Sequence, residues 1–233
     1  MKILALDTAT EIASCAVLEE DRVLGEININ FKNQHSVVLL PIINYLLESL
    51  NLSINDMDGY AVAMGPGSFT GLRIGVACVK GLSQGTNKPF CAISTLDSLA
   101  YNLAFNEGLI CPILDALRDS VYTALYRFEG NKLNRITDYM VLSIEELGKL
   151  LVKEETVVYF IGDGTIKYKN ALLALPLKAT LAPPSLNLVR ASSLGGLALM
   201  NLKEGKCEDL YTFAPIYLTK SSAERELERK AGL

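Results

Sequence analysis

The chain has 233 residues, and half of them are hydrophobic, so it is long and apolar enough for a full globular core in one domain or two lobes. Its formal net charge of −4 argues against a nucleic-acid surface on this chain alone, because proteins that bind nucleic acid normally carry a basic stripe. The acidic excess lies in residues 1–110, which hold 6 Lys and Arg against 11 Asp and Glu, whereas residues 111–233 hold 16 against 15.

The hydrophobic pattern of the first half predicts three strands, followed by helices that alternate with two further strands. The expected strands span residues 2–6, 13–18, 23–31, 60–64 and 89–94, and the expected helices span residues 34–50, 72–84 and 95–106. Asn33 or Ser36 is the expected N-cap of the first helix, and Pro41 is tolerated near its start.

The second half begins with a similar pattern, which suggests a duplicated lobe although the sequence shows no repeat at a fixed period. The expected strands span residues 109–114, 121–128, 133–142 and 156–161, and the expected helices span residues 144–152, capped by Ser143, and 189–202. Residues 222–230 read as a solvated helix or a frayed end. We expect two domains, residues 1–107 and 108–233.

The five cysteines predict a reduced state, because they are odd in number, widely spaced and form no Cys-x-x-Cys pair. The N-terminus reaches an acid, Asp7, too early for a signal peptide, and no run of about 18 apolar residues suggests a membrane span. We therefore expect a soluble cytoplasmic protein without membrane association.

The most distinctive stretch is residues 65–75, a glycine-rich segment between an expected strand and an expected helix. Free N–H groups and the helix dipole make such a place a candidate anion site. The spacing fits neither a dinucleotide fingerprint, because Thr70 occupies the place of a glycine, nor a P-loop, because no lysine occurs before Lys80. Ser68 or Thr70 can cap the helix, so the residues alone favour a structural turn over a phosphate site.

The helix expected at residues 34–50 is apolar around nearly its whole circumference. Such a helix must be covered on all sides, and a sheet can cover only one of them. The other side needs either the helix at 72–84 or another protein chain.

Residues 65–75 resemble the signature of the TsaB family, also called YeaZ, whose members are the non-catalytic partners in making threonylcarbamoyladenosine on tRNA. Further resemblances to family motifs occur at residues 7–10, 35–42, 115–122 and 215–218. Two positions depart from the family pattern. Leu117 stands where an arginine is usual, with Arg118 one place late, and Thr219 stands where another arginine is usual, with Lys220 next.

The resemblance implies an actin-like α/β fold of two lobes, as in Hsp70 and sugar kinases, with ribonuclease-H-like halves and a reduced second lobe. In that architecture the turn of Asp7, Thr8 and Thr10 faces nucleotide phosphates, where an aspartate holds a hydrated magnesium. The same hydroxyl groups can instead satisfy only local backbone groups. The signature-loop residues are Gly65, Pro66, Gly67, Ser68, Thr70, Gly71 and Arg73.

The resemblance also implies that the two long helices bind a catalytic transferase subunit of the TsaD type, or a second copy of this chain. The expected interface residues are His35, Val38, Leu39, Ile42, Ile43, Leu46, Leu47, Leu72, Gly75, Val76 and Val79, of which Leu47 and Val79 serve as examples of outward positions. An ATPase subunit of the TsaE type is a further expected partner. We expect tRNA to be held only through the complex, no intrinsic cofactor, and ATP or ADP with magnesium only in the partner complex.

His35 is the only histidine. Catalytic relatives carry a His-x-x-x-His metal pair on the equivalent helix, but here the fourth residue on is Leu39, so we expect no metal site. His35 is then a capping or packing residue. No Ser-His-Asp, Cys-His or paired-carboxylate arrangement can be defended, which favours a non-catalytic role.

Two other functions stay open at this point. An ATP-dependent small-molecule kinase of the same fold is compatible with Asp7 and the glycine loops, and a metallopeptidase is the less favoured alternative. Residues 162–164 (Gly-Asp-Gly), with Tyr168 after them, read as a second phosphate turn, as an adenosine-edge loop or as a turn that leads a helix.

Overall fold

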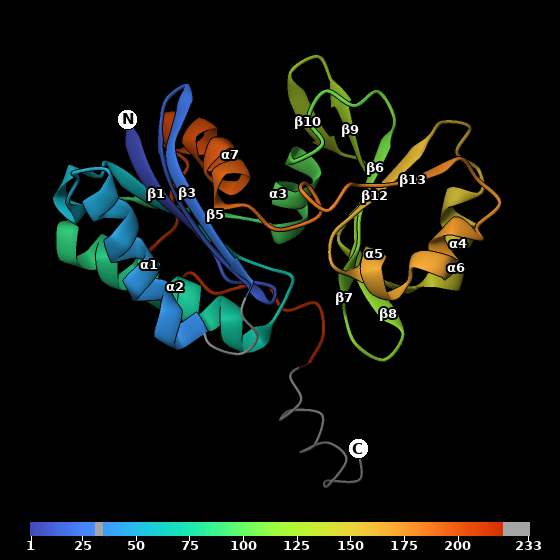
Figure 1. Cartoon of the computed structure of the whole chain (residues 1–233), viewed down its shortest axis with the longest axis horizontal. Helices are drawn as coiled ribbons and strands as arrows, with labels where there is room; N and C mark the ends of the chain where they lie inside the picture. The colour runs from blue at the N-terminus through green and yellow to red at the C-terminus, as the bar shows by residue number, and fades with distance from the viewer. Residues whose placement is uncertain (31–34, 221–233) are drawn as a thin grey trace, which may run out of the picture.

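The computed structural model describes residues 1–30 and 35–220, which form two lobes lying side by side (Figure 1). Asn33, expected as a cap, and the expected helix at residues 222–230 lie outside the described residues. Within the described part of the chain, no helix is both long and apolar enough to cross a membrane.

The first lobe is built on a five-stranded sheet of order β3-β2-β1-β4-β5, in which β1 pairs antiparallel with β2 and parallel with β4. Its strands are β1 (Lys2–Asp7), β2 (Ile12–Glu19), β3 (Arg22–Asn30), β4 (Gly59–Ala63) and β5 (Phe90–Ile93). Alternation along β1 sends Leu4 and Leu6 to one face of the sheet and Ile3 and Ala5 to the other. Both faces are therefore apolar, and both need a helical cover.

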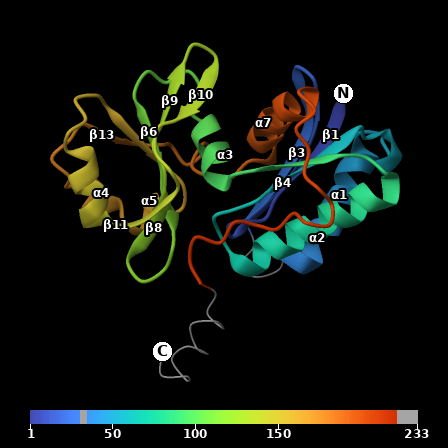
Figure 2. The same ribbon diagram turned by 180° about the vertical axis from the view of Figure 1, so that it is seen from behind.

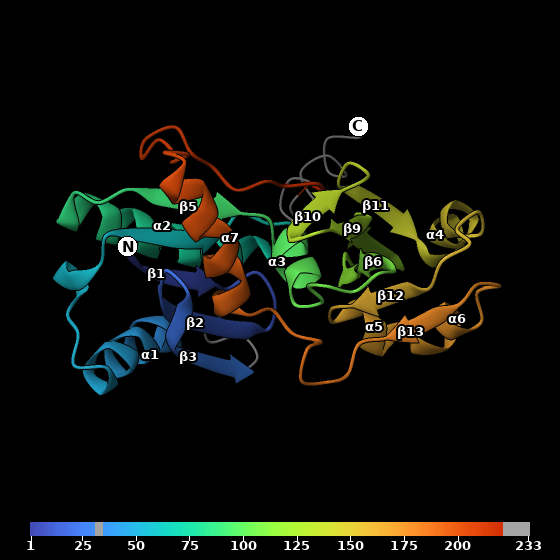
Figure 3. The same ribbon diagram turned by 90° about the horizontal axis from the view of Figure 1, so that it is seen from above.

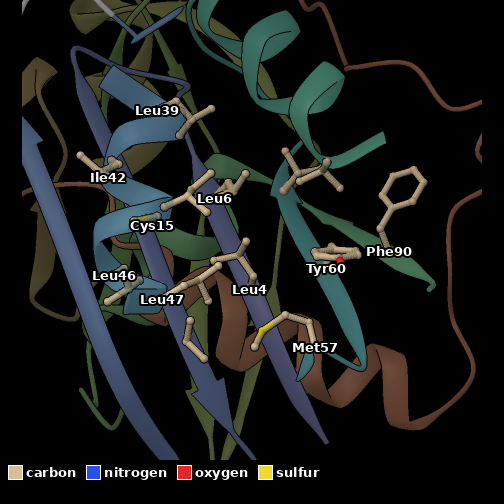
Figure 4. Packing of buried hydrophobic residues seen from close by; sticks show 14 of the residues in the cluster. Leu4, Leu6, Cys15, Leu39, Ile42, Leu46, Leu47, Met57, Tyr60 and Phe90 are labelled. Carbon is tan, nitrogen blue, oxygen red and sulfur yellow. The ribbon is translucent and has the colours of Figure 1, made fainter. Parts of the chain in front are cut away.

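Helices α1 (His35–Ser49) and α2 (Phe69–Thr86) cover the first face, and a short turn of 3₁₀ helix, η1 (Ile54–Asp56), precedes β4. Figure 4 shows Leu39, Ile42, Leu46 and Leu47 of α1 gathered over the sheet around Leu4. The first turn of α2 is capped by Ser68, whose Oγ accepts the N–H of Gly71 at 3.2 Å.

Helix α7 (Ala191–Lys203) covers the other face of this sheet, packing against Ile3, Ala5 and Leu18 (Figure 3). Gly195 allows this approach, because a Cβ there would lie 2.4 Å from a methyl group of Leu18. The expected division at residue 107 is therefore wrong in assigning α7 to the second lobe. The chain returns to complete the first lobe because the second face of its sheet has no other helix to bury it.

The second lobe combines a five-stranded sheet of order β10-β9-β6-β12-β13 with a three-stranded sheet of order β11-β8-β7. Its strands are β6 (Leu109–Pro112), β7 (Leu114–Asp115), β8 (Ser120–Thr123), β9 (Tyr126–Glu129), β10 (Lys132–Arg135), β11 (Met140–Ser143), β12 (Val158–Ile161) and β13 (Ala179–Leu181). Its helices are α3 (Thr95–Tyr101), α4 (Ile144–Leu151), α5 (Gly164–Lys167) and α6 (Lys169–Leu173). Helix α3 packs in this lobe's core through Leu96 and Leu99, so the expected boundary also falls too late at this side.

Two long strands expected in the second lobe, at residues 121–128 and 133–142, are wrong, because each is two short strands. The chain changes from the three-stranded to the five-stranded sheet between β8 and β9. Leu125 occupies this corner, where its N–H donates to Thr137 Oγ1 at 3.0 Å and its carbonyl accepts the N–H of Ile136 at 2.7 Å. The helix expected at residues 95–106 is likewise shorter and ends at Tyr101.

After α7 the chain runs back along α2 as an extended segment, residues 209–219, which we call the strap (Figure 2). Lys80 of α2 donates to the Phe213 carbonyl at 2.8 Å, and the Ile216 N–H donates to the Met64 carbonyl at 2.8 Å. Thr219, at the far end, shares a hydrogen bond of 2.7 Å with Tyr122 Oη of the second lobe. The strap is therefore a further connection between the lobes.

Candidate functional site

The signature loop lies directly on the turn that follows β1. A Cβ added to Gly71 would lie 2.0 Å from the Thr8 carbonyl oxygen, and one on Gly67 would lie 2.3 Å from that of Ala9. One turn further along α2, a Cβ on Gly75 would lie 2.5 Å from Thr8 Oγ1. The glycines are thus required for close packing of α2 on the turn, which agrees with the structural interpretation of the loop.

The carboxyl group of Asp7, the residue before this turn, is fully buried. Its Oδ1 accepts the Ala9 N–H at 2.9 Å, whereas its Oδ2 has no hydrogen-bond partner. Burial away from water raises the pKa of Asp7 from 3.8 to about 7, although the Ala9 hydrogen bond lowers it. Thr8 is also buried, and its Oγ1 donates to the Gly71 carbonyl at 2.7 Å.

These residues do not fit a magnesium–phosphate site in the arrangement described. Of the three residues expected to contact a nucleotide, only Thr10 lines a cavity, and its Oγ1 accepts the Ile12 N–H at 3.2 Å. Asp7 and Thr8 are buried, and the start of α2 packs against Thr8. The turn therefore provides the surface against which the start of α2 packs.

The cavity that Thr10 lines lies between the lobes and has a volume of about 1130 Å³. The signature loop and the starts of α1 and α2 form one wall, and β7, α5 and the end of the strap form the other. The residues expected as a second glycine turn, Gly162 and Gly164, are packed in the same way as the first, since Cβ atoms on both would lie 2.5 Å from Ile113 atoms. Gly164 begins α5, which confirms the reading as a turn that leads a helix.

Two carboxylates of the second lobe line the same cavity. Asp115 pairs with Lys167 at 3.0 Å and accepts a hydrogen bond from Tyr168 Oη at 3.4 Å. Burial in the cleft raises the pKa of Asp163 to about 6, and the Asp115 N–H that it accepts at 3.0 Å opposes this. The sequence pattern predicts neither the ion pair of Asp115 with Lys167 nor the position of Asp115 and Asp163 in the same cavity.

His35 lies at the first position of α1 and is 8% exposed. Its Nε2 donates to the Thr10 carbonyl at 2.6 Å, and its Nδ1 has no hydrogen-bond partner. This agrees with the expected packing role. Among residues 1–30 and 35–220, no group of three or more His, Cys, Asp or Glu side chains is arranged to hold a metal ion.

The expected interface residues lie mostly on the inner side of α1 and α2, so their assignment to an open surface is wrong. Leu47 is 7% exposed and Val79 is 0% exposed, although the sequence predicts both as outward positions. The side chains buried with them are those of Leu39, Ile42, Ile43, Leu46, Leu72 and Val76; Gly75 is also buried, and Val38 is partly buried. These side chains cover the apolar face of the sheet. The sequence pattern could not single them out, because α1 is apolar around nearly its whole circumference.

The outer side of the two helices carries other apolar residues. Val37, Leu40 and Tyr45 of α1 are 67%, 60% and 65% exposed. Between the helices lies a groove of about 480 Å³, which we call the α1/α2 groove, lined by Ser36, Leu39, Leu40, Ile74, Ala77, Cys78, Gly81 and Leu82. Of the expected interface residues, only Leu39 lines this groove.

The strap brings two sequence motifs, residues 65–75 and residues 215–218, into a contact that the sequence does not predict. Tyr217 stacks on Phe69 with ring centroids 4.7 Å apart, and the guanidinium of Arg73 lies 3.9 Å from the centroid of Phe69. Arg73 Nε also donates to Tyr217 Oη at 3.2 Å. Of the two departures from the family pattern, Leu117 is exposed at the β7–β8 turn, and Thr219 bonds Tyr122 as described.

Comparisons with known proteins agree with this geometry. A family model described as "TsaD: tRNA N6-adenosine threonylcarbamoyltransferase" matches residues 22–227. The tRNA threonylcarbamoyladenosine biosynthesis protein TsaB of Bacillus subtilis is 33% identical over 225 residues, which cover 96% of this chain and 96% of that protein.

Solved structures confirm the fold. YeaZ from Pseudomonas aeruginosa is similar with a TM-score of 0.80 at 28% identity, covering 93% of this chain and 99% of that chain. The ROK hexokinase from Thermus thermophilus is similar with a TM-score of 0.50 at 10% identity, covering 87% of this chain and 100% of that chain. The latter likeness concerns the fold alone, and together they confirm the expected actin-like architecture.

Proposed function

This chain belongs to the TsaB family of tRNA threonylcarbamoyladenosine biosynthesis proteins, within the wider family described by the TsaD model, and we propose that it is the non-catalytic partner of a TsaD-type transferase. Its role is to dock on the transferase subunit and hold it in a competent state. The modified base is the adenosine next to the tRNA anticodon, and the reaction takes place in the cytoplasm.

The observation that carries this proposal is the apolar outer side of α1 and α2. Leu40 is 60% exposed there and lines a groove of almost entirely apolar groups, and Val37 and Tyr45 of α1 are also more than half exposed. Exposed apolar patches of this kind on a soluble protein mark surfaces that bind other proteins. The residues of the transferase contact are therefore Val37, Leu40 and Tyr45 with the groove, in place of the inner residues.

A catalytic role is disfavoured by the side chains that the site contains. His35 is committed to the Thr10 carbonyl and has Leu39 in place of a second histidine. Asp7, the residue that would hold a metal in a kinase, is fully buried and does not line the interlobe cavity. We accordingly assign ATP or ADP with magnesium to the partner complex, and tRNA to the transferase, with a TsaE-type ATPase as the third component. In the absence of the transferase the same outer side would pair with a second copy.

Gly81 offers a sharp test of the docking surface. It lines the groove, and a Cβ at this position meets nothing within 4 Å, so a larger side chain does not disturb the fold. Gly81→Glu should stay folded and abolish measurable association with the transferase subunit, because the carboxylate would be desolvated without a partner. Association is measured by sedimentation, with Gly81→Ala as the small neutral control.

The result that contradicts the proposal is a folded Gly81→Glu that binds the transferase and supports tRNA modification as the unmodified chain does. The kinase alternative is tested on the isolated chain by calorimetry with ATP and magnesium. Tight binding without the partner would favour a kinase. The metallopeptidase alternative would require a stoichiometric transition metal in elemental analysis of the purified protein.

A further inference from the structure

Arg73 of α2 is an exposed arginine whose guanidinium group is positioned by two aromatic rings. The guanidinium carbon lies 3.9 Å from the ring centroid of Phe69 and 6.0 Å from that of Tyr217. The centroids of the two rings are 4.7 Å apart, and Arg73 Nε donates to Tyr217 Oη at 3.2 Å. Arginine packs on aromatic faces in this way because its charge is delocalised over a planar group.

The outer edge of this guanidinium group is open. Its Nε is used by Tyr217, whereas neither Nη atom makes a hydrogen bond or an ion pair with residues 1–30 or 35–220. Two Nη groups form a planar fork that matches the two oxygens of a carboxylate. An ordinary surface arginine must lose side-chain entropy to make such a pair, which is why most exposed ion pairs contribute little. The stacked Arg73 is already ordered, so this cost is reduced.

Arg73 continues the line of the α1/α2 groove. Arg73, Ala77 and Gly81 are spaced four residues apart, so they lie on one side of α2, and all three are exposed. Ala77 and Gly81 line the groove, whereas Arg73 lines neither the groove nor the interlobe cavity. Its charge therefore lies at the end of an apolar strip. An apolar centre with polar groups at the rim is the usual arrangement of a protein–protein interface.

The two helices are also locally positive within an acidic half of the chain. Helix α2 carries Arg73 and Lys80 and no Asp or Glu, and the only acid of α1 is Glu48 in its last turn. Residues 1–110 nevertheless hold 11 Asp and Glu against 6 Lys and Arg. A run of phosphates would be repelled by these surroundings, whereas one carboxylate on an apolar partner surface would meet only the local positive charge.

We propose that Arg73 binds a carboxylate of the protein that docks on the α1/α2 groove, and that Tyr217 of the strap is the positioning residue that holds the guanidinium for this contact. The proposal rests on the proposed docking of the transferase subunit and names one contact within it. It also gives the strap a role in binding, because the strap brings Tyr217 next to α2 from 144 residues further along the chain.

The first test titrates the full chain with the transferase subunit at several sodium chloride concentrations. Arg73→Gln should weaken binding at least about tenfold and make the remaining affinity less sensitive to salt. Arg73→Lys keeps the charge but has no fork, so it should recover only part of the loss. Arg22→Gln is the matched control and should leave binding unchanged. It removes the same charge at the β2–β3 turn, whose Glu20 lies 3.8 Å from Lys203 of α7, the helix on the other face of the sheet.

The second test is a double-mutant cycle that separates positioning from a structural role of Tyr217. Tyr217→Leu keeps an apolar side chain in the strap but removes the ring and the hydroxyl group. It should weaken binding at least about threefold when Arg73 is present and have no further effect in Arg73→Gln. A purely structural role would give the same loss in both backgrounds, and that result overturns the role of Tyr217.

Equal binding by Arg73→Gln and the unmodified chain, together with loss of binding in Gly81→Glu, overturns this proposal and leaves the proposed function intact. Failure of the unmodified chain to bind the transferase overturns both. A gel-shift assay on the complex tests the other source of an oxyanion. If Arg73→Gln leaves transferase binding unchanged but weakens tRNA binding by the complex, Arg73 contacts a tRNA phosphate and the proposal is wrong.

Discussion

The inner and outer sides of the layer formed by α1 and α2 both carry large apolar side chains, but these have opposite surroundings. On α1, Leu46 is 4% exposed on the inner side and Leu40 is 60% exposed on the outer side. On α2, Val79 is fully buried, and Ala77, two residues earlier, is exposed. Burial of the inner side stabilises the first lobe. The outer side leaves apolar surface in contact with water, which is typical of a surface that binds another protein.

The largest effect is expected from introducing a charge on each side of α2. Val79→Asp should destabilise the fold by more than about 4 kcal/mol, because a carboxylate without a partner would be buried against the sheet. Ala77→Asp should change the free energy of unfolding by less than about 0.5 kcal/mol and yet prevent association with the transferase. Urea unfolding and sedimentation measure the two effects.

If Ala77 and not Val79 faces the sheet, Ala77→Asp should lose stability and Val79→Asp should lose only binding. A folded Val79→Asp of ordinary stability, or an unfolded Ala77→Asp, would show that α2 is rotated relative to the structure described. Circular dichroism at low temperature distinguishes loss of fold from loss of binding in each variant.

The second prediction concerns Asp7, the fully buried last residue of β1. Its pKa of about 7 in the folded state lies above the 3.8 of an exposed aspartate, so the folded chain binds this proton more tightly than the unfolded chain. Stability should therefore fall as the pH rises from about 4 to 7 and then level off, by up to about 4 kcal/mol at 1.36 kcal/mol per pKa unit.

Asp7→Asn should remove this dependence, because the amide keeps an acceptor for the Ala9 N–H and never ionises. It should be more stable than the unmodified chain at pH 8 and similar at pH 4. Urea midpoints across this pH range measure the difference. Equal pH slopes in the two proteins would show that Asp7 is ionised in the folded state at little cost.

The elements of the first lobe could be predicted from the sequence because each depends on local pattern and caps. The strand at residues 2–6 and the capping role of Ser68 are confirmed, since alternation and a cap residue are local signals. The place of α7 could not be predicted, because it is decided by the second face of a sheet whose strands lie far earlier in the chain, between Lys2 and Ile93. The corner at Leu125 was missed because it depends on a bond to Thr137.

The faces of α1 could not be predicted for a related reason. A helix that is apolar all round contains no periodic signal for its inward side, so Leu40 and Leu46 look alike in the sequence. The contact of Arg73 with Tyr217 joins two motifs 144 residues apart and likewise has no local signal. The glycines of residues 65–75 predict close packing with another part of the backbone. Only the structure shows that this part is Thr8 and Ala9.

The third prediction is a matched truncation on α1. Leu46→Ala should destabilise the chain by about 3 kcal/mol, because a buried leucine loses its transfer free energy and leaves a cavity. Leu40→Ala should be within about 0.5 kcal/mol of the unmodified chain, because its side chain is already in water, and it should weaken transferase binding. Thermal unfolding and a binding titration measure both. Equal destabilisation by the two variants would contradict the distinction between the inner and outer sides.

The smallest and most discriminating effect comes from one substitution at two glycines of α2. Gly71→Ala places a methyl group 2.0 Å from the Thr8 carbonyl oxygen, a backbone atom that cannot move aside, so we expect about 1–3 kcal/mol of destabilisation. Gly81→Ala meets nothing within 4 Å and should stabilise the chain by about 0.5–1 kcal/mol, because alanine has the higher helix propensity. Opposite signs in urea unfolding would show that glycine serves close packing at the start of α2 and an open groove further along. If Gly71→Ala is neutral, the signature loop does not need its glycine for contact with the turn, and the reason for this residue must lie in binding.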